Sequence, residues 1–313
     1  MYEQIARNKR ASWLLVLGLV AILMLLGFVM GRALFGNERA GFGVLGVFGI
    51  VAIVWSLVGY YAGPRMVLAV AGAREVSHEQ APQFWNVVEE MAIAGGLPAP
   101  RVYVIEDPAP NAFATGRDPR QAAVAVTSGL LATMNRDELQ GVVAHELSHV
   151  RNYDIRFMTL VGILVGVIAL FCDFFLRFTL FGSRGRRDGG GGGNIVFLLI
   201  GLALAIIAPL VAMIVQFSVS RQREFLADAS AVQLTRNPAG LAAALEKIAA
   251  DPVPLRRTNR ATQHLYIANP LKKKKLKETS GLFDTHPPIG ERIAILRAME
   301  HGRELSPTAS PVS

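Results

Sequence analysis

Four long apolar segments most constrain what this chain of 313 residues can fold into. A helix needs about 20 predominantly apolar residues to cross a bilayer, and each segment reaches that length. The composition agrees, because 52% of the residues are hydrophobic and only 18% are charged. We therefore expect four transmembrane helices, arranged as two hairpins. The segments are residues 13–34, 41–61, 157–181 and 195–219.

Polar and special residues interrupt the second pair of segments. Asp173 and Arg177 stand four residues apart and can therefore pair on one helix face. Pro209 predicts a kink in the fourth segment. An alternative to full spanning is that these two helices pack partly against the folded part of the protein. The single cysteine, Cys172, excludes an intrachain disulfide, so nothing argues for an oxidising compartment.

The distribution of Lys and Arg predicts the orientation of these helices. Basic residues precede the first segment, as in a signal peptide, but the apolar stretch is too long for one and no clear cleavage site follows. Most other basic residues fall in connections that four spans place on one side, which the positive-inside rule makes cytoplasmic. Arg184, Arg186 and Arg187 are exceptions. We expect the active site and both termini in the cytoplasm.

The net charge of +8 does not indicate a nucleic-acid partner. The chain carries no basic patch interleaved with aromatic residues and no DNA-binding motif, so we expect no nucleic acid to bind. Basic flanks of membrane helices, and a surface that faces the lipid bilayer, account for the excess. The basic run at Lys272–Lys275 is expected to be a solvated loop, with binding to anionic lipid as the alternative.

The remaining sequence predicts a folded domain, interrupted by the second hairpin, that is α+β and mostly helical. Apolar periodicity indicates a helix over residues 80–93, and alternation indicates strands over residues 101–105 and 121–127. Asn237 and Pro238 are typical of a helix start. The expected organisation is a hairpin at 1–63, a first half-domain at 64–156, a second hairpin at 157–219, a second half-domain at 220–300 and a disordered tail at 301–313.

The motif His145-Glu146-Leu147-Ser148-His149 reads H-E-x-x-H and lies at the end of a run with helical character. Residues four apart share a helix face, so both imidazoles can reach one metal ion. Glu146 is then placed to act on a water molecule at that ion. This arrangement is typical of zinc peptidases. The alternative is two ordinary helix histidines beside a surface glutamate.

A catalytic zinc ion requires a third protein ligand and one open position. A histidine six residues after the motif would be one solution, but Ile155 stands there. A glutamate on a later helix is the other solution, and Glu224 is the best candidate. Asp228 lies one helical turn further on, where it could accept the second N–H of a ligand histidine.

Together these motifs make the chain resemble the M48 family of membrane zinc metallopeptidases, and within it the HtpX heat-shock protease group. The resemblance covers nearly the whole chain. It implies a zincin-like (gluzincin) metallopeptidase domain with a small β-sheet, combined with four transmembrane helices. The matching segments are His145–His149, Glu224–Asp228, Asn111–Ala114, His264–Leu271 and Thr285–Arg292.

The resemblance implies a role for each matching residue. His145, His149 and Glu224 correspond to the ligands of one Zn²⁺ ion, and Glu146 corresponds to the general base. Three further residues correspond to positions near the active site. Asn111 begins a segment expected to form an edge strand that pairs with extended substrate. His286 could stabilise the oxyanion, and Arg292 could hold the substrate backbone or support acidic groups. The alternative for the last two is a rigid turn and a structural ion pair.

The function implied is an endopeptidase of a bacterial plasma membrane that cleaves misfolded or damaged membrane proteins at the cytoplasmic face, with self-cleavage. The partners are then polypeptide substrates and the lipid bilayer. One alternative is a Ste24-type CAAX prenyl protease, although those chains are longer and carry more spans. The other is a membrane scaffold with a non-catalytic zinc site, although such sites usually have four Cys or His ligands.

Overall fold

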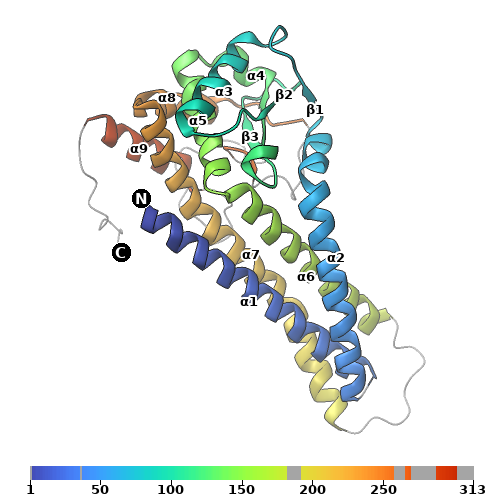
Figure 1. Cartoon of the computed structure of the whole chain (residues 1–313). Coiled ribbons are helices and arrows are strands. Elements are labelled where there is room, and N and C mark those ends of the chain that lie inside the picture. The colour runs from blue at the N-terminus through green and yellow to red at the C-terminus, as the bar shows by residue number, and fades with distance from the viewer. Residues whose placement is uncertain (1, 36, 182–191, 257–264, 269–286, 302–313) are drawn as a thin grey trace. The chain divides into compact units, whose positions relative to one another are not determined.

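The computed structural model describes residues 2–35, 37–181, 192–256, 265–268 and 287–301 (Figure 1). Its internal contacts divide the chain into two compact units. Residues 1–62 and 157–219 make up the first unit, and residues 63–156 and 220–313 make up the second. Residues 302–313 of the predicted tail, His264, His286 and the lysine run at 272–275 lie outside the described residues.

Long helices build the first unit (Figure 1). Within the described residues these are α1 (Tyr2–Phe35), most of α2 (Glu38–Ala71), α6 (Asp154–Phe181) and most of α7 (Gly192–Thr235). Leu19, Leu23, Leu26 and Met30 are buried and recur every three or four positions, so they form one apolar face of α1. These side chains share a core with residues of the other three helices.

Each predicted apolar segment lies within one of these helices. Among the described residues, however, no single helix has the length and hydropathy needed to cross a membrane. One bent pair of helical stretches, Gly41–Trp55 and Leu57–Ala71, meets the test by length and composition. Shorter apolar stretches occur at Leu17–Ala33 and Leu198–Ala212. The four spans therefore stay a prediction.

The second unit contains a four-stranded mixed sheet with the order β1-β2-β4-β3. Strands β1 and β2 pair antiparallel, β2 and β4 pair parallel, and β4 and β3 pair antiparallel. The order places β3 at an edge of the sheet. The strands are β1 (Ala73–Glu75), β2 (Arg101–Ile105), β3 (Ala112–Thr115) and β4 (Ala123–Thr127).

Helices pack against this sheet and against one another, and they carry much of the main core. Phe84 of α3, Val124 of β4, Val142 of α5 and Leu245 of α8 are all buried in one apolar cluster. Val102, Tyr103 and Ile105 of β2 and all residues of β4 are buried, which explains their apolar sequences. The helices are α3 (Pro82–Gly95), α4 (Ser128–Thr133), α5 (Arg136–Arg151), α8 (Pro238–Ala250) and α9 (Ile289–Glu300), with a short 3₁₀ turn at Pro119–Gln121.

Two features differ from the sequence-based expectation. Helix α2 continues through Pro64 to Ala71, beyond the predicted end at residue 61. A proline removes one backbone hydrogen bond, and burial of Leu68 and Ala71 in a core cluster holds the helix together past that point. Strand β1 was not predicted, because three residues are too few to show an alternating pattern.

Local interactions fix the helix that carries the H-E-x-x-H motif. Asn135 caps α5 by accepting a hydrogen bond from the Glu138 N–H, and the Glu138 carboxylate accepts one from the Asn135 N–H in return. Gly141 allows α5 to approach α8 closely. A Cβ atom at this position would lie 2.7 Å from the backbone nitrogen of Leu241.

Candidate metal centre

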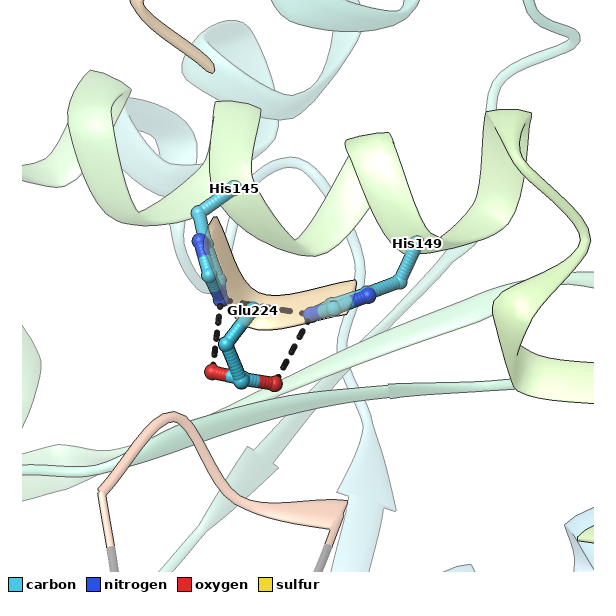
Figure 2. A group of neighbouring side chains, drawn as sticks. All are labelled: His145, His149 and Glu224. Atoms are coloured by element: carbon cyan, nitrogen blue, oxygen red, sulfur yellow. Dashed lines mark hydrogen bonds and ion pairs between the residues drawn. The ribbon is translucent and has the colours of Figure 1, made fainter. Parts of the chain in front are cut away.

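Helix α5 presents the two histidines and the glutamate of the motif to the interior of the second unit. His145 and Glu146 are buried, and His149 is mostly buried. The rings of His145 and His149 project from the same side of the helix, and their Nε2 atoms are 3.3 Å apart (Figure 2). The spacing of four residues thus produces the convergence expected of a helix.

Glu224 of α7 faces both rings (Figure 2). Its Oε1 atom is 3.3 Å from His149 Nε2, and its Oε2 atom is 3.6 Å from His145 Nε2. With metal–ligand bonds of about 2.0–2.1 Å, neighbouring ligands of a tetrahedral zinc ion stand about 3.3 Å apart. The two nitrogens and the carboxylate therefore fit a single ion with a fourth position left open, and these residues form a group that could hold a metal.

The second ring nitrogen of His145, Nδ1, contacts a carboxylate. This atom is 2.9 Å from Asp228 Oδ1. Arg292 of α9 binds the same carboxylate with two hydrogen bonds and lies 3.1 Å from Glu224 Oε2. The structure thus places Arg292 in contact with both acidic residues, and a role in holding substrate stays a prediction.

The His149 ring has a corresponding carboxylate that sequence reasoning missed. Its Nδ1 atom is 3.1 Å from Asp154 Oδ2, at the first residue of α6. The other Asp154 oxygen pairs with the buried guanidinium of Arg223. Asp154 follows His149 by five positions, which on a continuous helix would point it about 140° away. No local pattern therefore indicated it.

Burial governs the chemistry of Glu146. It raises the pKa of the Glu146 carboxyl above the usual value, against the opposing effect of His145 and His149. The backbone N–H of Ala114 also hydrogen-bonds this carboxyl. A raised pKa suits a group that must hold a proton between two steps of a reaction.

The edge strand β3 therefore lies beside Glu146. The hydrogen bond from Thr127 N–H to Asn111 O pairs Asn111 with β4, so Ala112 and Ala114 turn their backbone groups to the outer side. The Ala112 carbonyl accepts a hydrogen bond from the Ile267 N–H at 2.9 Å. The Ala112 N–H and C=O and the Ala114 N–H are thus all engaged within the protein. Pairing of this edge with an extended peptide stays a prediction.

Asn111 itself is buried and engaged with the protein backbone. Its Nδ2 atom donates to the Ala268 carbonyl at 3.0 Å, and its Oδ1 atom accepts from the Ala112 N–H at 3.0 Å. These bonds tie β3 to residues 265–268. Contact of Asn111 with substrate stays a prediction, as does the role of His286, which lies outside the described residues.

Comparison with known proteins places the chain in a family. The model of peptidase family M48 matches residues 78–300. The chain belongs to this family, and it is a membrane zinc metalloprotease whose substrates are polypeptides.

Bacterial relatives match along nearly the whole length. "Protease HtpX homolog" of Leuconostoc citreum (strain KM20) is 44% identical over 304 residues, which cover 96% of this chain and 100% of that protein. The protein of the same name from Listeria monocytogenes serotype 4a (strain HCC23) is 44% identical over 311 residues, with the same coverage.

A solved structure shares the fold. Ste24p of S. mikatae superposes with a TM-score of 0.50 at 18% sequence identity, covering 94% of this chain and 66% of that chain. The match supports the expected zincin-like fold, mostly helical with a small mixed sheet.

Proposed function

We propose that this metalloprotease holds one Zn²⁺ ion through His145, His149 and Glu224 and cleaves misfolded or damaged membrane proteins at the cytoplasmic face of a bacterial plasma membrane. The observation that carries the proposal is the spacing of the three ligand groups, 3.3–3.6 Å, beside the buried Glu146. The bacterial relatives named as proteases support it.

The residues of the site have separate tasks in peptide hydrolysis. When bound, the ion would supply a Lewis acid that activates water at neutral pH and polarises a peptide carbonyl. Glu146 accepts the proton of the attacking water and later delivers it to the leaving amine. Strand β3 lies beside Glu146, so a substrate that pairs with this strand would place its scissile bond near that residue.

The first unit supports a place in the membrane. The exposed side chains in the middle of α2 are apolar and nearly continuous, which is rare on the surface of a soluble monomer. They include Ile50, Ile53, Val54, Trp55, Leu57 and Val58. We propose that the four apolar segments span the bilayer, with both termini in the cytoplasm. A wash of membranes with alkaline carbonate should then leave the protein in the pellet.

A proteolysis assay tests the activity. Wild type and Glu146→Gln, purified in detergent, would be compared on a model membrane substrate with zinc and with chelator. We expect both proteins to bind zinc, and we expect the variant to cleave about 10²- to 10⁴-fold more slowly. Glu89→Gln, at an exposed position of α3, is the matched control and should cleave like wild type. Cleavage retained in Glu146→Gln would contradict the proposed role.

Cleavage of prenylated peptides is the second candidate, because the fold resembles that of Ste24p. The same two proteins would be offered a prenylated CAAX peptide and an unmodified membrane substrate. Preference for the prenylated peptide would favour this alternative, and zinc binding without cleavage of either would favour the scaffold.

A further inference from the structure

We propose that Asp154 is a positioning residue for His149, and that Arg223 holds the Asp154 carboxylate in place. The inference rests on the proposed zinc site, since it assigns to Asp154 the task of orienting one of its ligands. A histidine that binds metal through one ring nitrogen usually donates its other N–H to a carboxylate or carbonyl, which fixes both its tautomer and its orientation.

The chain adopts an uncommon backbone to bring the two residues together. Asp154 would face away from His149 on a continuous helix. Instead α5 ends at Arg151, and Tyr153 adopts φ 59°, in the left-handed region that non-glycine residues seldom occupy. This turn brings Asp154 Oδ2 to 3.1 Å from His149 Nδ1. A strained turn that serves a functional contact is a known pattern.

His149 depends on such a contact more than His145 does. The side chain of His145 is 0% exposed, so packing confines its ring in addition to the contact with Asp228, whereas that of His149 is 15% exposed. A ring with one open side can rotate about its side-chain bonds unless a hydrogen bond restrains it. Asp154 provides that bond on the side of the ring opposite the metal-binding nitrogen.

Arg223 completes the arrangement. The Asp154 and Arg223 side chains are both buried, and each neutralises the other in a place where an unpaired charge would be costly. Burial lowers the pKa of Arg223 to about 10, which leaves the guanidinium charged at neutral pH. Glu224 is the next residue on α7, so Arg223 reaches Asp154 while Glu224 reaches the histidines. The pair therefore links two ligands that lie far apart in the sequence.

A metal-binding measurement tests the proposal without relying on activity. Zinc affinity would be determined by competition with a chromophoric chelator for wild type, Asp154→Asn and Asp173→Asn. Loss of an outer partner of this kind typically weakens metal binding about 10- to 100-fold. We expect that loss in Asp154→Asn and none in Asp173→Asn, which neutralises an exposed carboxylate of the same helix that pairs with Arg177. Cobalt(II) absorption spectra should change only in Asp154→Asn.

Further variants separate orientation of the ligand from folding. Asp154→Asn removes the carboxylate that pairs with Arg223 but keeps the Arg223 charge, so the double variant Asp154→Asn, Arg223→Gln removes both charges together. We expect it to fold and to bind zinc as weakly as the single variant. Wild-type affinity in either variant would overturn the proposal. The proposal would also be overturned if the single and the double variant both fail to fold while Asp173→Asn folds. That result would assign Asp154 and Arg223 a structural role. Absence of zinc from wild type would instead refute the proposed function.

Discussion

The Asp228 carboxylate accepts two hydrogen bonds from the Arg292 guanidinium, at 2.8 Å from Nε and 2.7 Å from the nearer terminal nitrogen. Asp228 in turn meets His145, and Arg292 also reaches Glu224 and the Ile267 carbonyl. One guanidinium thus connects α9 with both ligand-bearing helices. Two parallel hydrogen bonds of this kind restrain a carboxylate better than a single contact does.

Replacement of Arg292 by methionine should destabilise the second unit. The change leaves Asp228 and Glu224 buried without their cation, and breaking a buried pair costs about 3–5 kcal/mol. Arg297→Met is the matched control on the same helix, because its side chain is 37% exposed, against 1% for Arg292. Pairs at such exposed positions contribute about 0–1 kcal/mol. Unfolding followed by tryptophan fluorescence would measure the stability of both variants. Equal losses of stability would contradict the stabilising role of the buried Arg292.

The ion pair between Asp228 and Arg292 should also make the stability of the protein depend on pH. Burial opposes ionisation of this carboxyl, but Arg292 and His145 hold its pKa below the ordinary value of 3.8. Its contribution to stability is therefore complete at neutral pH and is lost as the pH falls through the lowered pKa. In metal-free protein, we expect the stability margin of wild type over Asp228→Asn to shrink as the pH falls below 3.8. A margin that keeps growing below that pH would contradict this.

The parts of the site that could be predicted from the sequence are those that local geometry determines. A spacing of four residues on a helix brought His145 and His149 together, and a spacing of four again aligned Glu224 with Asp228. The apolar patterns likewise predicted α3, β2 and β4 within a few residues.

The remaining parts depend on a break or on contacts between distant segments. Asp154 reaches His149 only because the helix ends before Tyr153, and the sequence carries no signal for that turn. By sequence, Arg223 does not differ from the other basic residues that flank a predicted membrane span, because its buried partner lies on another helix. Strand β1 is formed by its pairing with β2, and its own three residues carry no strand pattern that the sequence could show.

Removal of a single ligand should release the metal. We expect Glu224→Ala to lose zinc affinity by more than the roughly 10- to 100-fold caused by loss of an outer partner, since two histidines cannot hold a tetrahedral ion alone. Elemental analysis after gel filtration would count zinc per chain. Glu246→Ala, which removes an exposed carboxylate of α8 paired with Arg297, should keep the wild-type content. If Glu224→Ala retains one zinc ion per chain, the third ligand must be a residue other than Glu224.

The glycine at the crossing of α5 and α8 should tolerate no side chain. Alanine normally stabilises a helix relative to glycine by about 1 kcal/mol. At Gly141, however, the added methyl group would stand 2.7 Å from the Leu241 nitrogen and 2.8 Å from its Cα, which are backbone atoms that cannot move aside alone. Overpacking of this kind costs about 1–3 kcal/mol, so Gly141→Ala should lower the unfolding midpoint and, by displacing α5, weaken zinc binding. Gly95→Ala in α3 meets only ordinary side-chain contacts at 3.5 Å and beyond, so it should neither lower the unfolding midpoint nor weaken zinc binding. If both variants behave alike, the close approach of the two helices does not set the position of the motif.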